Sequence, residues 1–224
     1  MKRTLGALSI LLLAGASLAS AQSTPPGQNN PSQTPVAAPP EASQPLTAAD
    51  RQKALDYLEK TRKGVLDATA GLSEAQWTFK AGPDRWSIAE VTEHIAAAED
   101  FLRGNLEDNI LKAPPRTQKA DVAELDAMVL KTIPDRSKKF EAPEPLKPTN
   151  RFGSPQAAVD HFKESRAKTM ELAKTRQDFR EHATTSPFGN ELDAYEWLLF
   201  LAAHSERHTK QILEVKEDPN FPKS

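Results

Sequence analysis

The chain has 224 residues, with 29 lysines and arginines against 31 aspartates and glutamates, and it has no cysteine. The net charge of −2 argues against a nucleic-acid-binding protein, because such proteins carry a strong basic excess. The lack of cysteine excludes disulfides, iron–sulfur clusters, thiolate zinc sites and a cysteine nucleophile. A bound metal would therefore need histidine or carboxylate ligands.

Residues 1–21 have the pattern of a secretory signal peptide. Lys2 and Arg3 precede an apolar stretch over residues 5–18, and residues 19–21 (Ala-Ser-Ala) fit the small-x-small cleavage site. An uncleaved membrane anchor is the alternative, but the apolar stretch is shorter than the roughly 20 residues that span a bilayer. We therefore expect cleavage, export to the periplasm or the medium, and no membrane span in the mature protein.

Residues 22–46 hold seven of the 18 prolines among Ser, Gln, Asn and Ala, without apolar periodicity. Such a segment buries too little apolar surface to offset the entropy lost on ordering. We interpret it as a disordered linker, which leaves residues 47–217 as the folded domain. A domain of this size buries about 70% of its unfolded surface, so it needs no covalent staple.

Apolar residues recur at spacings of three and four through four long segments, which predicts four amphipathic helices. These segments cover about residues 48–70, 87–110, 154–186 and 190–216. Thr47 is a good N-cap for the first helix, and Ser87 with Glu90 forms a capping box for the second. Ser154 followed by Pro155 is a favoured start for the third helix.

Two of the three connections between these helices carry signals of their own. Residues 72–86 have the signal of one helical turn at 73–77, and residues 111–153 contain prolines, polar patches and a short helical pattern around 121–132. The second connection is long enough for a parallel crossover between the second and third helices. Because strand signals are nearly absent, the sequence predicts an all-α, up-down-down-up four-helix bundle.

The five histidines divide by their surroundings. His161 lies on the charged side of the third helix and His182 beyond its apolar pattern, so both are expected at the solvated surface. His94, His204 and His208 lie within apolar faces, where an unpaired imidazole is costly. These three are the candidates for a buried site.

The spacing of these three histidines predicts a metal site. His204 and His208 are four residues apart, so they share one helical face, about 6 Å apart along the axis. Such a pair alone is more often structural. His94 lies seven residues after the start of the second helix, level with His208 if the second and fourth helices are antiparallel. Three neutral imidazoles suit a divalent transition metal such as Zn, Ni or Fe, and they leave coordination positions open for catalysis.

The remaining catalytic residues are not identified by the sequence. Glu206 does not complete an H-E-x-x-H motif, because it lies two residues after His204 and points away from the ligand face. The aromatic residues Trp86, Tyr195 and Trp197 are candidates for a pocket wall, although packing in the core is the more usual role.

The order of several short motifs resembles the DinB superfamily of metal-binding four-helix bundles over about residues 47–216. The motifs are Asp84-Arg85-Trp86-Ser87-Ile88-Ala89-Glu90-Val91, His94-Ile95, Phe152-Gly153-Ser154, Ser165-Arg166 and His204-x-x-x-His208 with Gln211-Ile212.

This resemblance implies an up-down-down-up bundle with His94, His204 and His208 as metal ligands. It also implies either a metal-dependent hydrolase or a transferase or isomerase that uses mycothiol, bacillithiol or glutathione, and a possible homodimer. The signal peptide departs from the thiol-dependent pattern, because these thiols are mainly cytosolic.

Three hypotheses follow. The protein is a metal-dependent hydrolase or thiol transferase acting on a small molecule, a non-catalytic exported binding module, or a metal-free helical protein whose histidines are satisfied core groups.

Overall fold

The structure is a computed structural model that describes residues 45–223. The predicted signal peptide and all but the last two residues of the predicted linker lie outside the described residues. The helices are α1 (Ala48–Thr69), α2 (Glu74–Thr78), α3 (Ile88–Asp108), α4 (Val122–Thr132), α5 (Pro155–Thr175) and α6 (Ala194–Lys216). The described residues also form two short 3-10 turns, η1 (Ile110–Lys112) and η2 (Glu144–Leu146), and a hairpin of β1 (Ala183–Thr185) and β2 (Glu191–Asp193). None of the described helices combines the length and apolar composition needed to cross a membrane.

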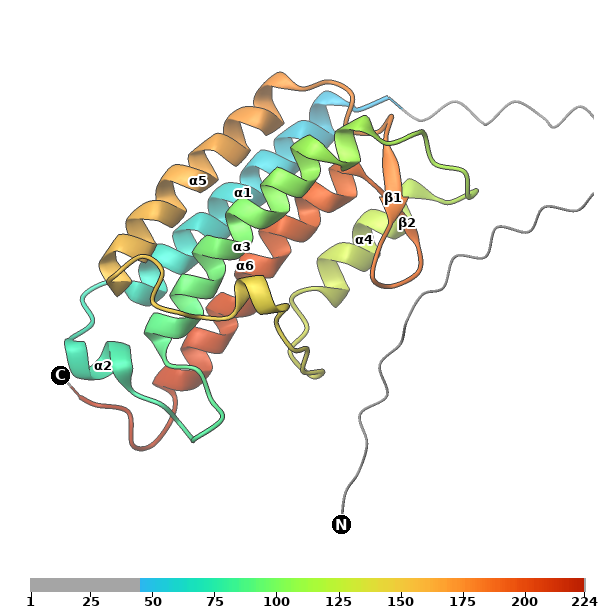
Figure 1. Ribbon diagram of the computed structural model, residues 1–224. Helices are drawn as coiled ribbons and strands as arrows, with labels where there is room; N and C mark the ends of the chain where they lie inside the picture. Colours follow the sequence, from blue (N-terminus) through green and yellow to red (C-terminus); the bar gives the residue numbers. More distant parts are fainter. Residues whose placement is uncertain (1–44, 224) are drawn as a thin grey trace, which may run out of the picture. The chain divides into compact units, whose positions relative to one another are not determined.

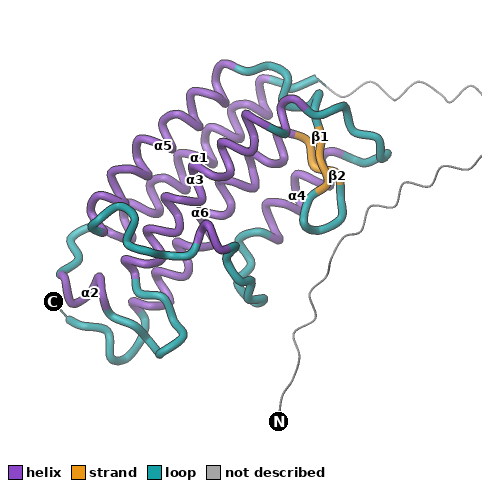
Figure 2. Tube along the Cα trace, in the orientation of Figure 1, coloured by secondary structure: helices purple, strands orange, loops and turns teal. Residues whose placement is uncertain are grey.

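The four long helices α1, α3, α5 and α6 lie side by side as a bundle (Figures 1 and 2). The hydroxyl of Tyr195 at the start of α6 donates to the carbonyl of Asp50 at the start of α1, so these helices run parallel. Arg51 at the start of α1 donates to the carbonyl of Ala173 at the end of α5, so those two are antiparallel. With α3 antiparallel to α6, these contacts confirm the predicted up-down-down-up topology.

The predicted starts of the first two helices are confirmed by their capping contacts. The Thr47 hydroxyl accepts a hydrogen bond from the backbone N–H of Asp50, and the Asp50 carboxylate accepts one from Thr47. Ser87 and Glu90 make the same reciprocal pair at the start of α3. Each pair satisfies backbone donors that a helix leaves free at its first turn.

The boundaries predicted around residues 176–193 were wrong. The third helix ends at Thr175 rather than near residue 186, and the fourth begins at Ala194 rather than near residue 190. An antiparallel hairpin occupies this stretch, and its turn contains Gly189 at a φ of +86°, which favours glycine. Asp193 ends the hairpin and caps α6, because its carboxylate accepts from the backbone N–H of Glu196.

The long crossover from α3 to α5 passes through η1, α4 and η2. α4 packs on the outside of α6, and η2 crosses the face formed by α3 and α6 (Figure 1). Polar contacts from both helices hold the crossover at the level of the histidines, as described below.

A buried ion pair joins the four long helices. Arg166 of α5 is fully buried and contacts both carboxylate oxygens of Glu99 on α3, at 2.8 and 2.7 Å. The same guanidinium donates to the carbonyl of Leu58 and the hydroxyl of Thr61 on α1, at 2.8 and 2.7 Å. It also donates to the hydroxyl of Ser205 on α6, at 2.8 Å. Because a buried charge requires such partners, these contacts specify how the helices are aligned along the bundle.

Candidate metal centre

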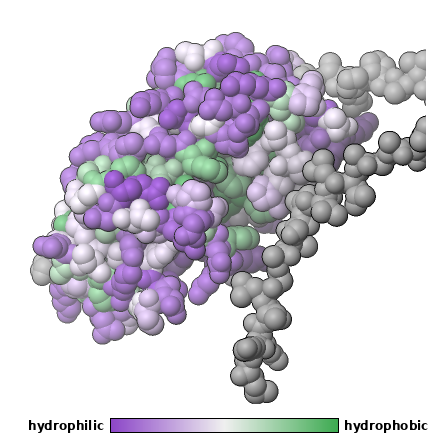
Figure 3. Space-filling view, viewed as in Figure 1, coloured by the Kyte–Doolittle hydropathy of each residue, from purple (hydrophilic) through white to green (hydrophobic). Residues whose placement is uncertain are grey.

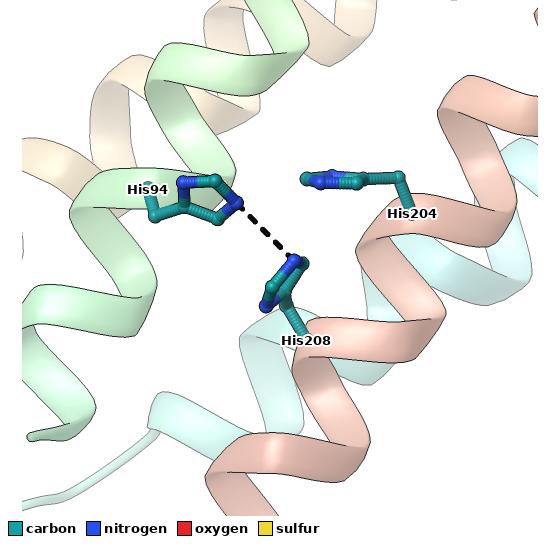
Figure 4. A group of neighbouring side chains, drawn as sticks. All are labelled: His94, His204 and His208. Atoms are coloured by element: carbon teal, nitrogen blue, oxygen red, sulfur yellow. Dashed lines mark hydrogen bonds between the residues drawn. The ribbon is translucent and has the colours of Figure 1, made fainter. Parts of the chain in front are cut away.

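The structure brings His94, His204 and His208 together between α3 and α6 (Figure 4). One nitrogen from each ring lies within 4.8 Å of those of the other two. The ring centroids of His94 are 5.1 Å from His204 and 4.4 Å from His208. The predicted convergence of the three imidazoles is therefore confirmed as geometry.

Hydrogen bonds fix the orientation of two of the rings. Nδ1 of His94 lies 2.9 Å from the carbonyl of Leu146, and Nδ1 of His208 lies 2.8 Å from Oε1 of Gln211. Because a carbonyl oxygen can only accept, each Nδ1 carries the proton. In the neutral rings, each Nε2 then holds a lone pair.

The two Nε2 lone pairs face one another. Nε2 of His94 lies 3.2 Å from Nε2 of His208, the contact marked by the dashed line in Figure 4. Two lone pairs at this distance repel each other unless a cation lies between them. Metal–nitrogen bonds of about 2.0–2.1 Å place two ligands of a tetrahedral ion about 3.3 Å apart. The donor set therefore fits a divalent metal ion.

Burial keeps all three imidazoles neutral. Desolvation lowers the pKa of His94, and it lowers the pKa of His208 well below its usual value. Burial, reinforced by the neighbouring His94 and Arg207, lowers the pKa of His204 to about 3. Since metals bind the neutral form of imidazole, the site needs no deprotonation step at neutral pH.

The comparison with known proteins agrees with this geometry. Residues 57–212, more than two thirds of the chain, match the DinB superfamily. The chain belongs to the DinB superfamily. It is 27% identical over 164 residues to the uncharacterized protein YuaE of Bacillus subtilis (strain 168), covering 73% of this chain and 97% of that protein.

A solved four-helix bundle structure shares the fold. YfiT from Bacillus subtilis is described as a probable metal-dependent hydrolase with an unusual four-helix bundle topology. It aligns with a TM-score of 0.50 and 14% identity, covering 83% of this chain and 94% of that chain. At this identity the likeness concerns the bundle architecture.

Glu93, which precedes His94 in this DinB bundle, holds the crossover against α3. Its carboxylate accepts from the backbone N–H groups of Thr149 at 2.7 Å, Asn150 at 2.8 Å and Arg151 at 3.2 Å. It also accepts from Nε of Arg151 at 3.1 Å. Burial alone would raise the pKa of Glu93, but these hydrogen bonds outweigh it and hold the pKa below its usual value.

The segment held by Glu93 includes the carbonyl that binds His94. The Arg151 guanidinium donates to the carbonyls of Pro145 at 2.8 Å and Lys147 at 2.6 Å, on either side of Leu146. The Glu93–Arg151 pair thus places the Leu146 carbonyl on Nδ1 of His94.

Two arginines support the opposite side of the centre. Arg207, between the two α6 histidines, donates to the carbonyls of Asp135 and, at 2.6 Å, Lys138. Arg136 donates to Oε1 of Gln211 at 3.3 Å, so that oxygen is shared with Nδ1 of His208. These supporting residues could not be predicted from the sequence, because most of their partners are backbone carbonyls and N–H groups of the crossover.

Of the other candidate residues, one lies beside the centre and the rest lie away from it. Trp86 lies beside the centre, with its ring 5.1 Å from that of His94. Tyr195 is buried in the core at the far end of α6, and the indole of Trp197 donates to Thr184 of the hairpin. Glu206 points away from the centre, as predicted, and accepts from the hydroxyl of Tyr57.

His161 and His182 take no part in the centre. Both are partly exposed, as the sequence predicts, but each has a partner. His161 pairs with Asp100 of α3, and Nδ1 of His182 donates to the carbonyl of Ala113.

Proposed function

We propose that His94, His204 and His208 bind a divalent transition metal ion (Zn, Ni or Fe), and that the protein is a metal-dependent hydrolase of a small molecule. The observation that carries the proposal is the pair of Nε2 lone pairs facing each other at 3.2 Å. Satisfied core histidines would not adopt this arrangement. The shared bundle architecture with YfiT, described as a probable metal-dependent hydrolase, supports the same reaction class.

A divalent ion in such a site supplies Lewis acidity and makes water nucleophilic at neutral pH. The chain's own residues orient and protect the site. Leu146 and Gln211 hold two imidazoles in the tautomer that directs Nε2 inward, and Trp86 packs against His94. Three protein ligands leave at least one position for a substrate group, which is typical of a catalytic site.

Metal analysis of the purified protein tests the ligand assignment. The wild-type protein should bind close to one metal ion per chain, and the double variant His204→Ala, His208→Ala should bind almost none. His161→Ala is the matched control and should retain the metal, because its ring lies outside the centre. Near-stoichiometric metal in the double variant would contradict the assignment.

Turnover tests the enzymatic part of the proposal. Hydrolysis of small esters or amides that requires the metal would support a hydrolase. Turnover that appears only with an added thiol and an electrophile would support the thiol transferase alternative. Activity that survives removal of the metal would contradict both, and metal binding without any turnover would favour a non-catalytic module.

We also propose that the protein acts after export. The supporting observation is the signal-peptide pattern of residues 1–21.

A further inference from the structure

A cavity lies outside the metal centre, between α1, α4 and α6. Its volume is about 320 Å³, at the lower end of the range for small-molecule sites. The residues that line it are Lys53, Tyr57 and Lys60 of α1, Leu130 of α4, and Leu199 and Glu206 of α6. Because Glu206 points away from the three histidines and none of them lines the cavity, this cavity is separate from the metal centre.

The floor of the cavity is apolar. Leu199 is 1% exposed and belongs to the hydrophobic core. Leu130 and Tyr57 are partly buried and pack against the same core. A ligand with an apolar body would therefore remove its own surface, and part of the surface of Leu130 and Tyr57, from water.

The carboxylate in the cavity wall is already neutralised. Glu206 accepts from the hydroxyl of Tyr57 at 3.1 Å. Its oxygens also lie 2.9 Å from Nζ of Lys210 and 3.5 Å from Nζ of Lys60. Burial alone would raise the pKa of Glu206, but these partners outweigh it and hold the pKa below its usual value. Glu206 is therefore ionised and paired at neutral pH, and it leaves no unpaired negative charge to attract a cationic ligand.

Lys53 is the cation of the cavity that has no such partner. Hydrophilic residues cover much of the molecular face seen in Figure 3, and many of the lysines of the described residues pair with carboxylates. Lys53 is exposed and pairs with no carboxylate among residues 45–223. An unpaired ammonium group at the edge of an apolar cavity favours a ligand that brings a negative charge.

We infer that this cavity binds a small organic anion, with its charged group at Lys53 and its apolar part against Leu130, Leu199 and the ring of Tyr57. Lys53 and Lys60 are seven residues apart, so the cavity extends about 10 Å along α1, which suits an extended chain such as that of octanoate. This inference is independent of the proposed metal-dependent reaction. A second copy of the chain covering the cavity is the alternative occupant.

Octanoate and octanol test the inference, because they share an eight-carbon chain and differ in charge. We expect octanoate to shift the methyl NMR signals of Leu130 and Leu199 in the purified protein. Excess acetate is present throughout, so that the carboxylate does not report binding at the metal centre. Lys53→Gln should weaken octanoate binding about threefold, the effect of one exposed ion pair, and leave octanol binding unchanged. Leu130→Ser should weaken the binding of both ligands about fivefold.

Lys168→Gln is the matched control. Lys168 is an exposed lysine that also pairs with no carboxylate in the described part of the chain, and it lies on α5, which does not line the cavity. Its substitution should leave both affinities at the wild-type value. Equal octanoate affinities for Lys53→Gln and wild type would overturn the inference, as would octanoate that shifts neither methyl signal. A wild-type dimer that Leu130→Ser dissociates, with neither signal shifted by octanoate, would assign the cavity to a contact between two copies instead.

Discussion

The position of two protons distinguishes this centre from an ordinary cluster of buried histidines. The acceptors of Leu146 and Gln211 draw the protons of His94 and His208 to Nδ1, on the side away from the third ring. Nε2 is thereby left free at the centre of the cluster. Partners of this kind commonly fix the tautomer and orientation of a metal-binding imidazole.

Gln211 should consequently contribute to metal affinity without touching the ion. We expect Gln211→Ala to weaken Zn²⁺ binding about tenfold, because loss of such a supporting partner typically costs 10- to 100-fold. Competition against a chelator of known affinity measures the change. Lys210→Ala on the same turn is the control, since Lys210 pairs with Glu206 on the other side of the helix. Equal Zn²⁺ affinities for Gln211→Ala and wild type would show that the His208 ring keeps its orientation without the hydrogen bond to Gln211.

At the scale of secondary-structure elements, local chemistry decided which boundaries could be predicted. The helix starts at Thr47 and Ser87 were predictable, because a capping box consists of two residues that lie three positions apart in the sequence. The end of α5 was not, because the apolar spacing fades gradually after Ala173. The hairpin that follows has strands of three residues each, too short for an alternating pattern to identify.

The hydrogen bonds from residues 149–151 of the crossover to Glu93 give a second prediction. Glu93→Gln replaces one carboxylate oxygen by an NH₂ group that faces backbone N–H donors, so it should loosen residues 149–151 and the Leu146 carbonyl. We expect Zn²⁺ affinity to fall about tenfold, together with faster amide hydrogen exchange in residues 145–151. Glu90→Gln is the control, because glutamine still completes the capping box one turn earlier. Faster exchange in the crossover with unchanged Zn²⁺ affinity would show that the hydrogen bonds of Glu93 do not contribute to metal binding.

A cluster of buried charges holds the opposite end of α6. Its members are the carboxylates of Asp126, Asp193 and Glu196, the guanidinium groups of Arg116 and Arg180, and Asp50, which lies 3.9 Å from Arg180. Carboxylates outnumber guanidinium groups in this cluster. Burial, reinforced by Asp193, raises the pKa of Glu196 to about 8.

This cluster predicts a pH-dependent stability. The folded protein holds a proton on Glu196 that the unfolded chain releases near pH 4.5, so the free energy of unfolding should fall as the pH rises toward 8. We expect wild type to lose about 1–3 kcal/mol relative to Glu196→Gln between pH 5 and pH 9. Urea unfolding at each pH measures the difference, with Glu191→Gln as control, because Glu191 is a partly exposed carboxylate on the strand that precedes α6. Parallel curves for wild type and Glu196→Gln would contradict a raised pKa.

At the scale of the whole molecule, topology explains why a distant histidine joins an adjacent pair. His94 meets His204 and His208 because α3 and α6 are antiparallel neighbours, and the long crossover permits that arrangement. The three imidazoles were thus predictable from spacing and one topological argument. Glu93 and Arg151 were not, because their role depends on backbone groups of an irregular segment.

The buried ion pair predicts how strongly the four helices depend on one contact. Arg166→Met would leave the Glu99 carboxylate buried without its partner, which typically costs 3–5 kcal/mol. We therefore expect the free energy of unfolding to fall by about that amount. The double variant Arg166→Met, Glu99→Gln removes both charges and should recover part of the loss. If the double variant is less stable than the single one, the unpaired carboxylate is not the cause.

The proposed export bears on which chemistry the centre can perform. Cleavage after Ala21 would give a protein that starts at Gln22 and works away from the cytosolic thiols that a thiol transferase needs. We expect mass spectrometry of the exported fraction from a bacterial host to find this N-terminus. Ala21→Phe should block cleavage because the site requires a small residue, whereas Ala37→Phe in the predicted linker should not. Full-length protein confined to the cytosol would contradict export. It would also remove the objection to a thiol cosubstrate, so that a thiol transferase would fit the location of the protein as well as a hydrolase does.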